Sequence, residues 1–331
     1  MLFKEVNNAA NEEIREYIPI SGNLAFGTMK PHIVAAERDY IRPLIGSETL
    51  TALDDYYNNE GSGEVNSPEI WDGLLERCQR AVINIAFFIG FDLMNIVIDD
   101  AGFGRTEGEN RKGLYKYQED NLRMLFKLNA FNGFDDILTY LHENISTFND
   151  YAASDEYASF KTLFFRRTED FDKVYNIGKS HLTFNRLKQY ITLTEDLELS
   201  KVFGVTLWAY IKTEIAKAAP AAKVTALIPY IKNVLAYLST AKLMSDTGAD
   251  LTENGLYFTA WKAIEKSQTQ ISPADKDRVQ RLIERNEMIG NKYMAELKLF
   301  LTTNVTDWPT FENSSSYLHS RDNTDKKTFW S

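Results

Sequence analysis

The 331-residue sequence contains little cysteine, proline, glycine or histidine: one, 8, 17 and four residues, respectively. A single cysteine excludes an intrachain disulfide, and Cys78 lies in an apolar stretch, so we expect a buried thiol. Sparse glycine and proline disfavour a many-turned β fold and favour helices. No two histidines have the HxxxH spacing of a helical metal site. We therefore predict no metal and no other cofactor.

Positive charge is also scarce: the formal net charge is −10, and no Lys/Arg run exceeds a pair. This excludes a strong grip on nucleic acid, although acidic walls would let DNA slide past without sticking. The most membrane-like segment, residues 81–98, is interrupted by Asn84, Asp92 and Asn95, which predicts a buried helix and no membrane span. The first residues lack the apolar run of a signal peptide, so we expect synthesis in a reducing cytoplasm.

The sequence repeats itself. An offset of 158 residues aligns Phe26 with Phe184 and brings five identities into register, where about one is expected by chance. The identical positions are Phe26, Lys30, Ile33, Glu37 and Gly46, on Phe184, Lys188, Ile191, Glu195 and Gly204. Their spacing predicts one helix in each half, with the two glycines where that helix bends or ends.

Two further pairs of segments match with the apolar stripe of an amphipathic helix. In the second helix Leu74, Cys78, Ala81, Val82 and Ile85 fall on Leu227, Ile231, Val234, Leu235 and Leu238. In the third, at an offset of 160, Leu122, Phe134, Ile137 and Leu141 fall on Leu282, Met294, Leu297 and Leu301. We predict a mainly α protein of two tandem homologous helical-bundle units, residues 1–165 and 166–331, with long loops between second and third helices and an extended C-terminal tail.

Both long loops contain a D-x-G-x-x-x-T-E pattern, at residues 100–107 and 246–253. The carboxylates lack the alternating oxygen ligands of a calcium loop. Two interpretations remain open: a tight turn followed by a strand-like or capped helical restart, or a surface for a partner subunit. The candidate partner-binding residues are Asp99, Asp100, Gly102, Phe103, Arg105, Thr106, Glu107, Asp246, Gly248, Thr252 and Glu253.

Aromatic residues follow both third helices, outside the helical periodicity. They either pack back on their own core or dock on a neighbouring subunit, where aromatic anchors are favoured. Trp308, Phe311 and Tyr317 are the candidate docking residues in the tail.

No catalytic motif is recognisable. The glycine-rich run at 102–108 lacks the GK[ST] of a phosphate loop, no G-x-S-x-G is present, and Cys78 has no histidine nearby in sequence. We predict no catalytic residue and no enzymatic activity.

The chain resembles a known family over both units, nearly its whole length, and most strongly in the first half. The residues are Glu16-Tyr-Ile-Pro-Ile20, Phe26, the stretch A-E-R-x-Y-I-x-P-L-I-G ending at Gly46, and the turn Ile98–Gly102. They are similar to an uncharacterised family of Bacteroidetes phages and prophages. More distantly, they resemble the helical head–tail connector (adaptor) proteins of tailed phages, and the ring proteins of crAss-like phages. In the second half the A-E-R stretch is replaced, so its contacts are expected to differ.

The resemblance implies a virion protein at the head–tail junction. It would form a homo-oligomeric, dodecameric ring below the portal, bind the portal protein and the next ring or tail protein, and extend the DNA channel without sequence-specific contacts or a membrane. Two alternatives stay open: another virion assembly or tail-completion component, and a helical enzyme.

Overall fold

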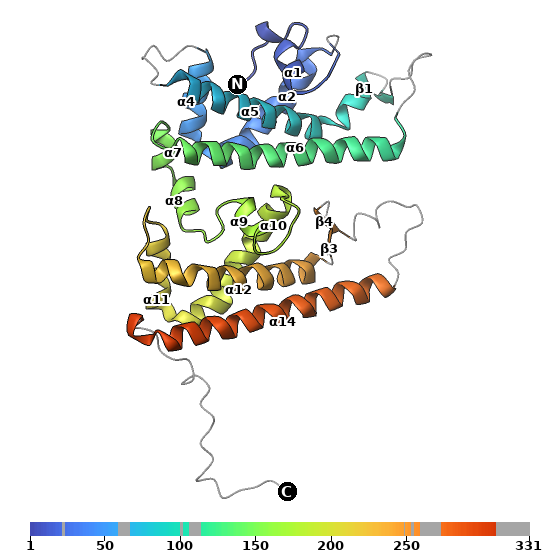
Figure 1. Cartoon of the computed structure of the whole chain (residues 1–331). Helices are drawn as coiled ribbons and strands as arrows, with labels where there is room; N and C mark the ends of the chain where they lie inside the picture. The colour runs from blue at the N-terminus through green and yellow to red at the C-terminus, as the bar shows by residue number, and fades with distance from the viewer. Residues whose placement is uncertain are drawn as a thin grey trace, which may run out of the picture. The chain divides into compact units, whose positions relative to one another are not determined.

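The computed structural model describes residues 1–21, 24–58, 67–99, 102–105, 114–247, 249–252, 255–258 and 273–308. The chain forms two compact helical units (Figure 1). Unit 1 is Met1–Phe160 with Arg167–Glu169 and Lys179–Phe184; unit 2 is Lys161–Arg166, Asp170–Gly178 and Asn185–Ser331. The predicted boundary after residue 165 lies within residues 161–184, where segments of the two units alternate along the chain. The mainly α prediction is confirmed.

Unit 1 is built on a pair of long helices, α5 and α6, which lie side by side in Figure 1. Its elements are η1 (Val6–Asn8), α1 (Glu12–Tyr17), α2 (Phe26–Ala36), the π-helical turn η2 (Glu37–Ile41), α3 (Arg42–Ile45), α4 (Ser47–Asn58), α5 (Pro68–Gly90), η3 (Leu93–Asn95), β1 (Ile96–Asp99), β2 (Gly102–Arg105), α6 (Lys116–Glu143) and α7 (Asn149–Ala153). Then α8 (Asp155–Lys161), α9 (Thr168–Asp172) and α10 (His181–Thr194) lead into unit 2.

Unit 2 repeats this order around α12 and α14. After α10 come the π-helical turn η4 (Glu195–Leu199), α11 (Ser200–Ile215), α12 (Ala222–Thr247), β3 (Ala249–Thr252), β4 (Gly255–Phe258), α14 (Pro273–Thr303) and η5 (Val305–Asp307). In the part of the chain that the structure describes, none of the helices has the length and apolar character needed to cross a bilayer.

The predicted apolar stripes form the cores. On α5, Cys78, Ala81 and Val82 have no exposed surface, so the expectation of a buried thiol is confirmed. The equivalent residues of α12, Ile231 and Val234, are also fully buried. Each stripe removes apolar area from water, at about 25 cal/mol per Å², and this burial drives the packing of the long helices.

The two glycines end the first helix of each unit as predicted. Gly46 has φ 84° and ψ 156°, and Gly204 has φ 73° and ψ 158°. This combination is essentially restricted to glycine, because a Cβ would clash with the backbone. In both units the chain therefore changes direction at the same place, nine residues after Glu37 and Glu195.

Each long loop contains a β-hairpin. Strand β1 pairs antiparallel with β2, with Asp99 opposite Gly102, and β3 pairs with β4, with Thr252 opposite Gly255. The hairpins correspond at an offset of 153 residues, from Ile96 to Ala249, which is also the offset of the second helix from Leu74 to Leu227.

The alignment of the two D-x-G-x-x-x-T-E patterns is therefore wrong. It needs an offset of 146 residues, from Asp100 to Asp246, whereas the hairpins match at 153. Thr252 is the last residue of β3, whereas Thr106, the threonine of the first pattern, comes after β2 in the sequence. Asp246 lies in the last turn of α12. The two patterns are thus not structurally equivalent, and the equivalent glycines are Gly102 and Gly255.

Candidate functional site

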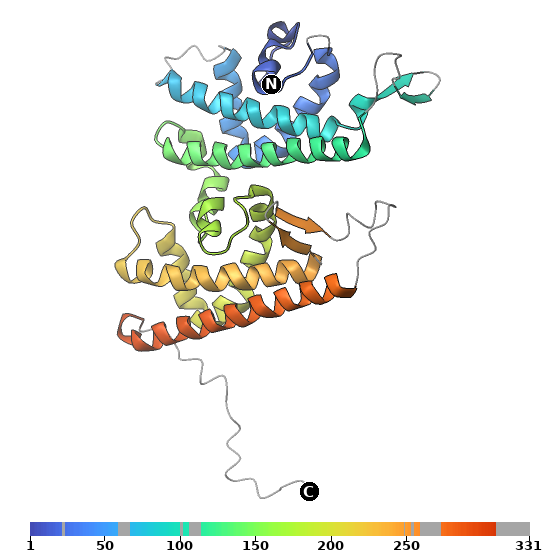
Figure 2. The ribbon, with the colours of Figure 1, turned by 45° about the vertical axis from the view of Figure 1, so that its right-hand side comes forward.

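The β1–β2 hairpin holds most of the predicted contact residues of unit 1. Asp99, Gly102, Phe103 and Arg105 lie on its strands, with Phe103 opposite Ile98. Figure 2 shows this hairpin extending beyond the end of the α5–α6 pair. The positions Asp100, Thr106 and Glu107 lie outside the described residues. An isolated two-stranded hairpin is at best marginally stable in water, so a partner surface would stabilise it.

The second hairpin brings together fewer of the predicted residues. Thr252 ends β3, and Asp246 is exposed on α12. Gly248 and Glu253 lie outside the described residues. The common feature of the two units is therefore the hairpin itself, and the acidic pattern is not shared at equivalent positions.

The prediction that Trp308 docks on a neighbouring subunit is wrong, because its ring packs on the core of its own unit. Its side chain is 1% exposed, and the Lys223 ammonium lies 5.1 Å from its ring centroid. The Lys223 ammonium also donates to the Asp307 carbonyl at 2.9 Å. A ring buried in unit 2 offers no surface to a neighbour, so Trp308 is a core residue and no docking anchor. Phe311 and Tyr317 lie outside the described residues.

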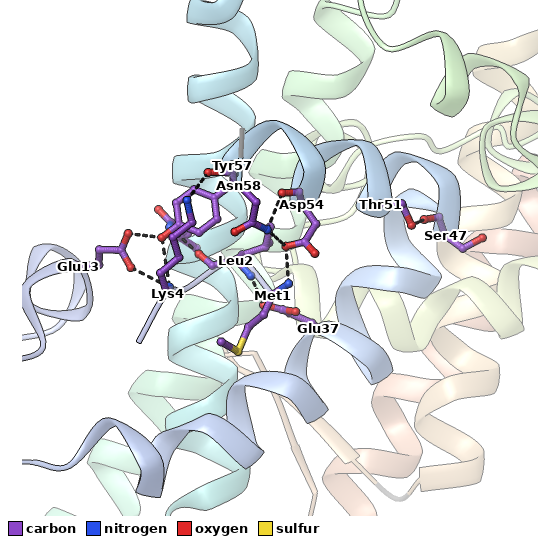
Figure 3. Close-up of polar contacts among 11 residues, drawn as sticks. Met1, Leu2, Lys4, Glu13, Glu37, Ser47, Thr51, Asp54, Tyr57 and Asn58 are labelled. Atoms are coloured by element: carbon purple, nitrogen blue, oxygen red, sulfur yellow. Dashed lines mark hydrogen bonds and ion pairs between the residues drawn. The ribbon is translucent and has the colours of Figure 1, made fainter. Parts of the chain in front are cut away.

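A second repeated feature, not singled out from the sequence, is a buried glutamate at the first position of each π-helical turn. In unit 1, Glu37 Oε1 accepts a hydrogen bond from the Leu2 N–H at 2.7 Å. Close to Glu37, the Met1 ammonium forms an ion pair with Asp54, as Figure 3 shows. Burial raises the pKa of Glu37, although the Leu2 N–H and the nearby ammonium oppose the shift.

In unit 2 the equivalent Glu195 is also buried. Its Oε2 accepts a hydrogen bond from the Lys212 ammonium at 2.6 Å, and that ammonium also donates to the Thr162 carbonyl at 2.9 Å. Oε1 of Glu195 is buried and has no hydrogen-bond partner among the described residues. Burial raises the pKa of Glu195 against the opposing pull of Lys212.

The two sites are variants of one arrangement. At the offset of 158 residues Lys212 occupies the position of Asp54, so an ammonium near the buried glutamate comes from α11 in unit 2 and from Met1 in unit 1. The identity of Glu37 and Glu195 in the repeat was the signal that could have revealed them. π-Helical turns often occur at functional positions, yet these carboxyls are enclosed, and their contacts fix the helix junction.

One polar trio in unit 1 superficially resembles a catalytic relay. His181 Nδ1 lies 3.1 Å from Asp135 Oδ1 and 2.9 Å from Thr168 Oγ1. A relay needs its acid and its nucleophile on opposite ring nitrogens, whereas both partners here contact Nδ1. Burial opposes ionisation of Asp135, but the hydrogen bonds from His181 and Thr168 prevail and lower its pKa. The trio has the geometry of a structural contact.

The described residues contain no cluster of His, Cys, Asp and Glu able to hold a metal ion. A groove on unit 1 is lined by Ser47, Glu48, Thr51, Ala52, Asp55 and Asp150. Its three carboxylates lie without a ligating histidine or cysteine among those lining residues, and this composition alone assigns no chemistry to it.

The fold and the repeated hairpins define a mainly α protein made of two homologous helical-bundle units. One family profile, described as a family of unknown function (DUF6712), matches the chain twice, over residues 41–161 and 199–321. The chain belongs to this family, and the double match confirms the predicted tandem duplication. No curated protein and no solved structure matches the chain.

Proposed function

We propose that this chain is a structural subunit of a tailed-phage particle: a head–tail connector that forms a ring below the portal and extends the DNA channel to the tail. The observation that carries the proposal is the hairpin found at the same place in both units, between the second and third helices. Repeated small elements that extend from helical bundles are suited to contacts between subunits.

Two sequence features support this function. The resemblance of residues 16–46 to the phage family and to connector proteins gives the proposal its particular partners, the portal and the tail. The net charge of −10 suits a wall past which DNA slides, because like charges repel the phosphates. Localisation at the head–tail junction of the virion belongs to the same proposal.

Deletion of Gly102–Glu109 tests the hairpin's role. We expect the helical content and melting temperature to stay unchanged, because the long helices bury their cores without the hairpin. Binding to the portal protein of the same phage genome is expected to weaken on the order of tenfold or more, since interface energy concentrates in few residues.

The matched control removes Asn59–Ser62, which lie between α4 and α5 in the sequence, and should bind portal as the unaltered chain does. Equal portal binding by both deletions would contradict the hairpin's role. Failure of the unaltered chain to bind portal would contradict the function itself.

A further inference from the structure

One position of the second helix is filled differently in the two units. At the offset of 153 residues, Gln79 of α5 corresponds to Lys232 of α12. The Gln79 side chain is buried, donates to the Leu2 carbonyl at 2.7 Å and accepts from the Tyr17 hydroxyl at 2.8 Å. A neutral amide with both polar atoms bonded therefore satisfies this position in unit 1, and the fold does not require a charge there.

Lys232 is half-buried, and within the described part of the chain its ammonium has no hydrogen bond and no ion pair. The ammonium lies 5.3 Å from the centroid of the Phe165 ring, which in turn packs on Phe171 with the two ring centroids 4.8 Å apart. The side chains three and four residues away on α12 offer no acceptor: Ile228, Pro229, Leu235 and Ala236. A cation taken out of water in this way needs an anionic partner.

Other charged groups gather around Lys232 in unit 2. Arg166 follows the first of the two packed rings in the sequence, and Asp170 precedes the second. Burial, Arg166 and Lys173 lower the pKa of Lys232, whereas Asp170 opposes the shift. Asp170 already forms an ion pair with Lys173 at 3.7 Å. Three cations around one carboxylate leave two positive charges in excess, in a chain whose formal net charge is −10.

We propose that Lys232, Arg166 and Lys173 bind one phosphate dianion, either inorganic phosphate or the phosphate of a monoester. The two negative charges of the dianion match the excess positive charge of the cluster, whereas a single carboxylate would neutralise half of it. Phosphate oxygens accept charge-assisted hydrogen bonds from guanidinium and ammonium groups. Arg166 is positioned for this role, because its guanidinium is anchored by donating to the Lys161 carbonyl at 2.8 Å. The inference does not depend on the proposed connector function.

Isothermal titration calorimetry of the full chain with inorganic phosphate, at constant ionic strength, tests the site. Lys232→Gln introduces the residue type of unit 1, and Lys173→Gln removes the exposed cation of the cluster. Lys201→Gln, at an exposed lysine of α11, is the matched control. We expect saturable binding by the unaltered chain and K201Q, and binding at least about tenfold weaker for K232Q and K173Q, since each removes one of the cations.

Titrations with acetate and with duplex DNA that lacks terminal phosphates identify the anion. We expect both to bind at least about tenfold more weakly than phosphate, because neither offers a dianion. Phosphate binding by K232Q and K173Q equal to that of the unaltered chain, or no saturable binding by the unaltered chain, would overturn the site. Acetate bound as tightly as phosphate, or DNA bound through Lys232 in place of phosphate, would overturn the choice of ligand. Circular dichroism should agree for all four proteins, and K173Q decides alone if K232Q does not fold.

Discussion

At the residue scale, the buried glutamates make stability depend on pH. Because the folded pKa of Glu195 is raised, the folded state binds its proton more tightly than the unfolded chain does. Its contribution is therefore fully favourable below the unfolded pKa, about 4.3, and is lost as pH rises through the folded pKa, by about 1.4 kcal/mol for each unit of difference.

The variant Glu195→Gln removes this titration. We expect the unaltered chain to gain stability relative to E195Q as pH falls from neutral towards the unfolded pKa, in chemical denaturation at several pH values. Glu37→Gln should behave in the same direction in unit 1, and Glu48→Gln, on the exposed part of α4, is the control. A stability difference that is constant with pH for E195Q would contradict the raised pKa.

Trp308 gives a second prediction at this scale. Trp308→Ala should lower the free energy of unfolding by about 3–5 kcal/mol, the usual cost of truncating a large buried aromatic side chain. Val305→Ala, on the neighbouring exposed surface of η5, should change it by less than about 0.5 kcal/mol. Unchanged stability of W308A combined with lost self-association would instead restore the docking role.

At the scale of elements, the glycine bends can be tested directly. Gly46→Ala and Gly204→Ala should each destabilise the protein by about 1–3 kcal/mol, because both glycines have a backbone conformation that alanine rarely adopts. Gly27→Ala in α2 is the control, since an added Cβ there meets nothing within 4 Å. Thermal or chemical unfolding measures all three, and a G204A protein as stable as G27A would show that the bend is not strained for alanine.

Sequence reasoning captured the elements whose signal is local. The apolar stripes of α5, α6, α12 and α14 have helical spacing, and Gly46 and Gly204 mark a bend by their type alone. The sequence comparison placed Asp100 on Asp246, because four identical residues outweighed the offset of 153 residues that the second helix gives. The π-helical turns depend on contacts from distant segments, such as Leu2 to Glu37, and no local pattern reports those.

At the scale of the whole molecule, the duplication gives one chain two similar units with different outer surfaces. Exposed positions have diverged, as Tyr117 and the equivalent Asp277 show, while the core positions stayed apolar. Divergence of this kind allows a single chain to contact a neighbour through two distinct faces, as a ring requires.

Electron microscopy of the chain mixed with its portal protein tests the central claim most directly. We expect closed rings that share the portal's rotational axis. Portal particles without added density, beside free chains of monomer size, would contradict it.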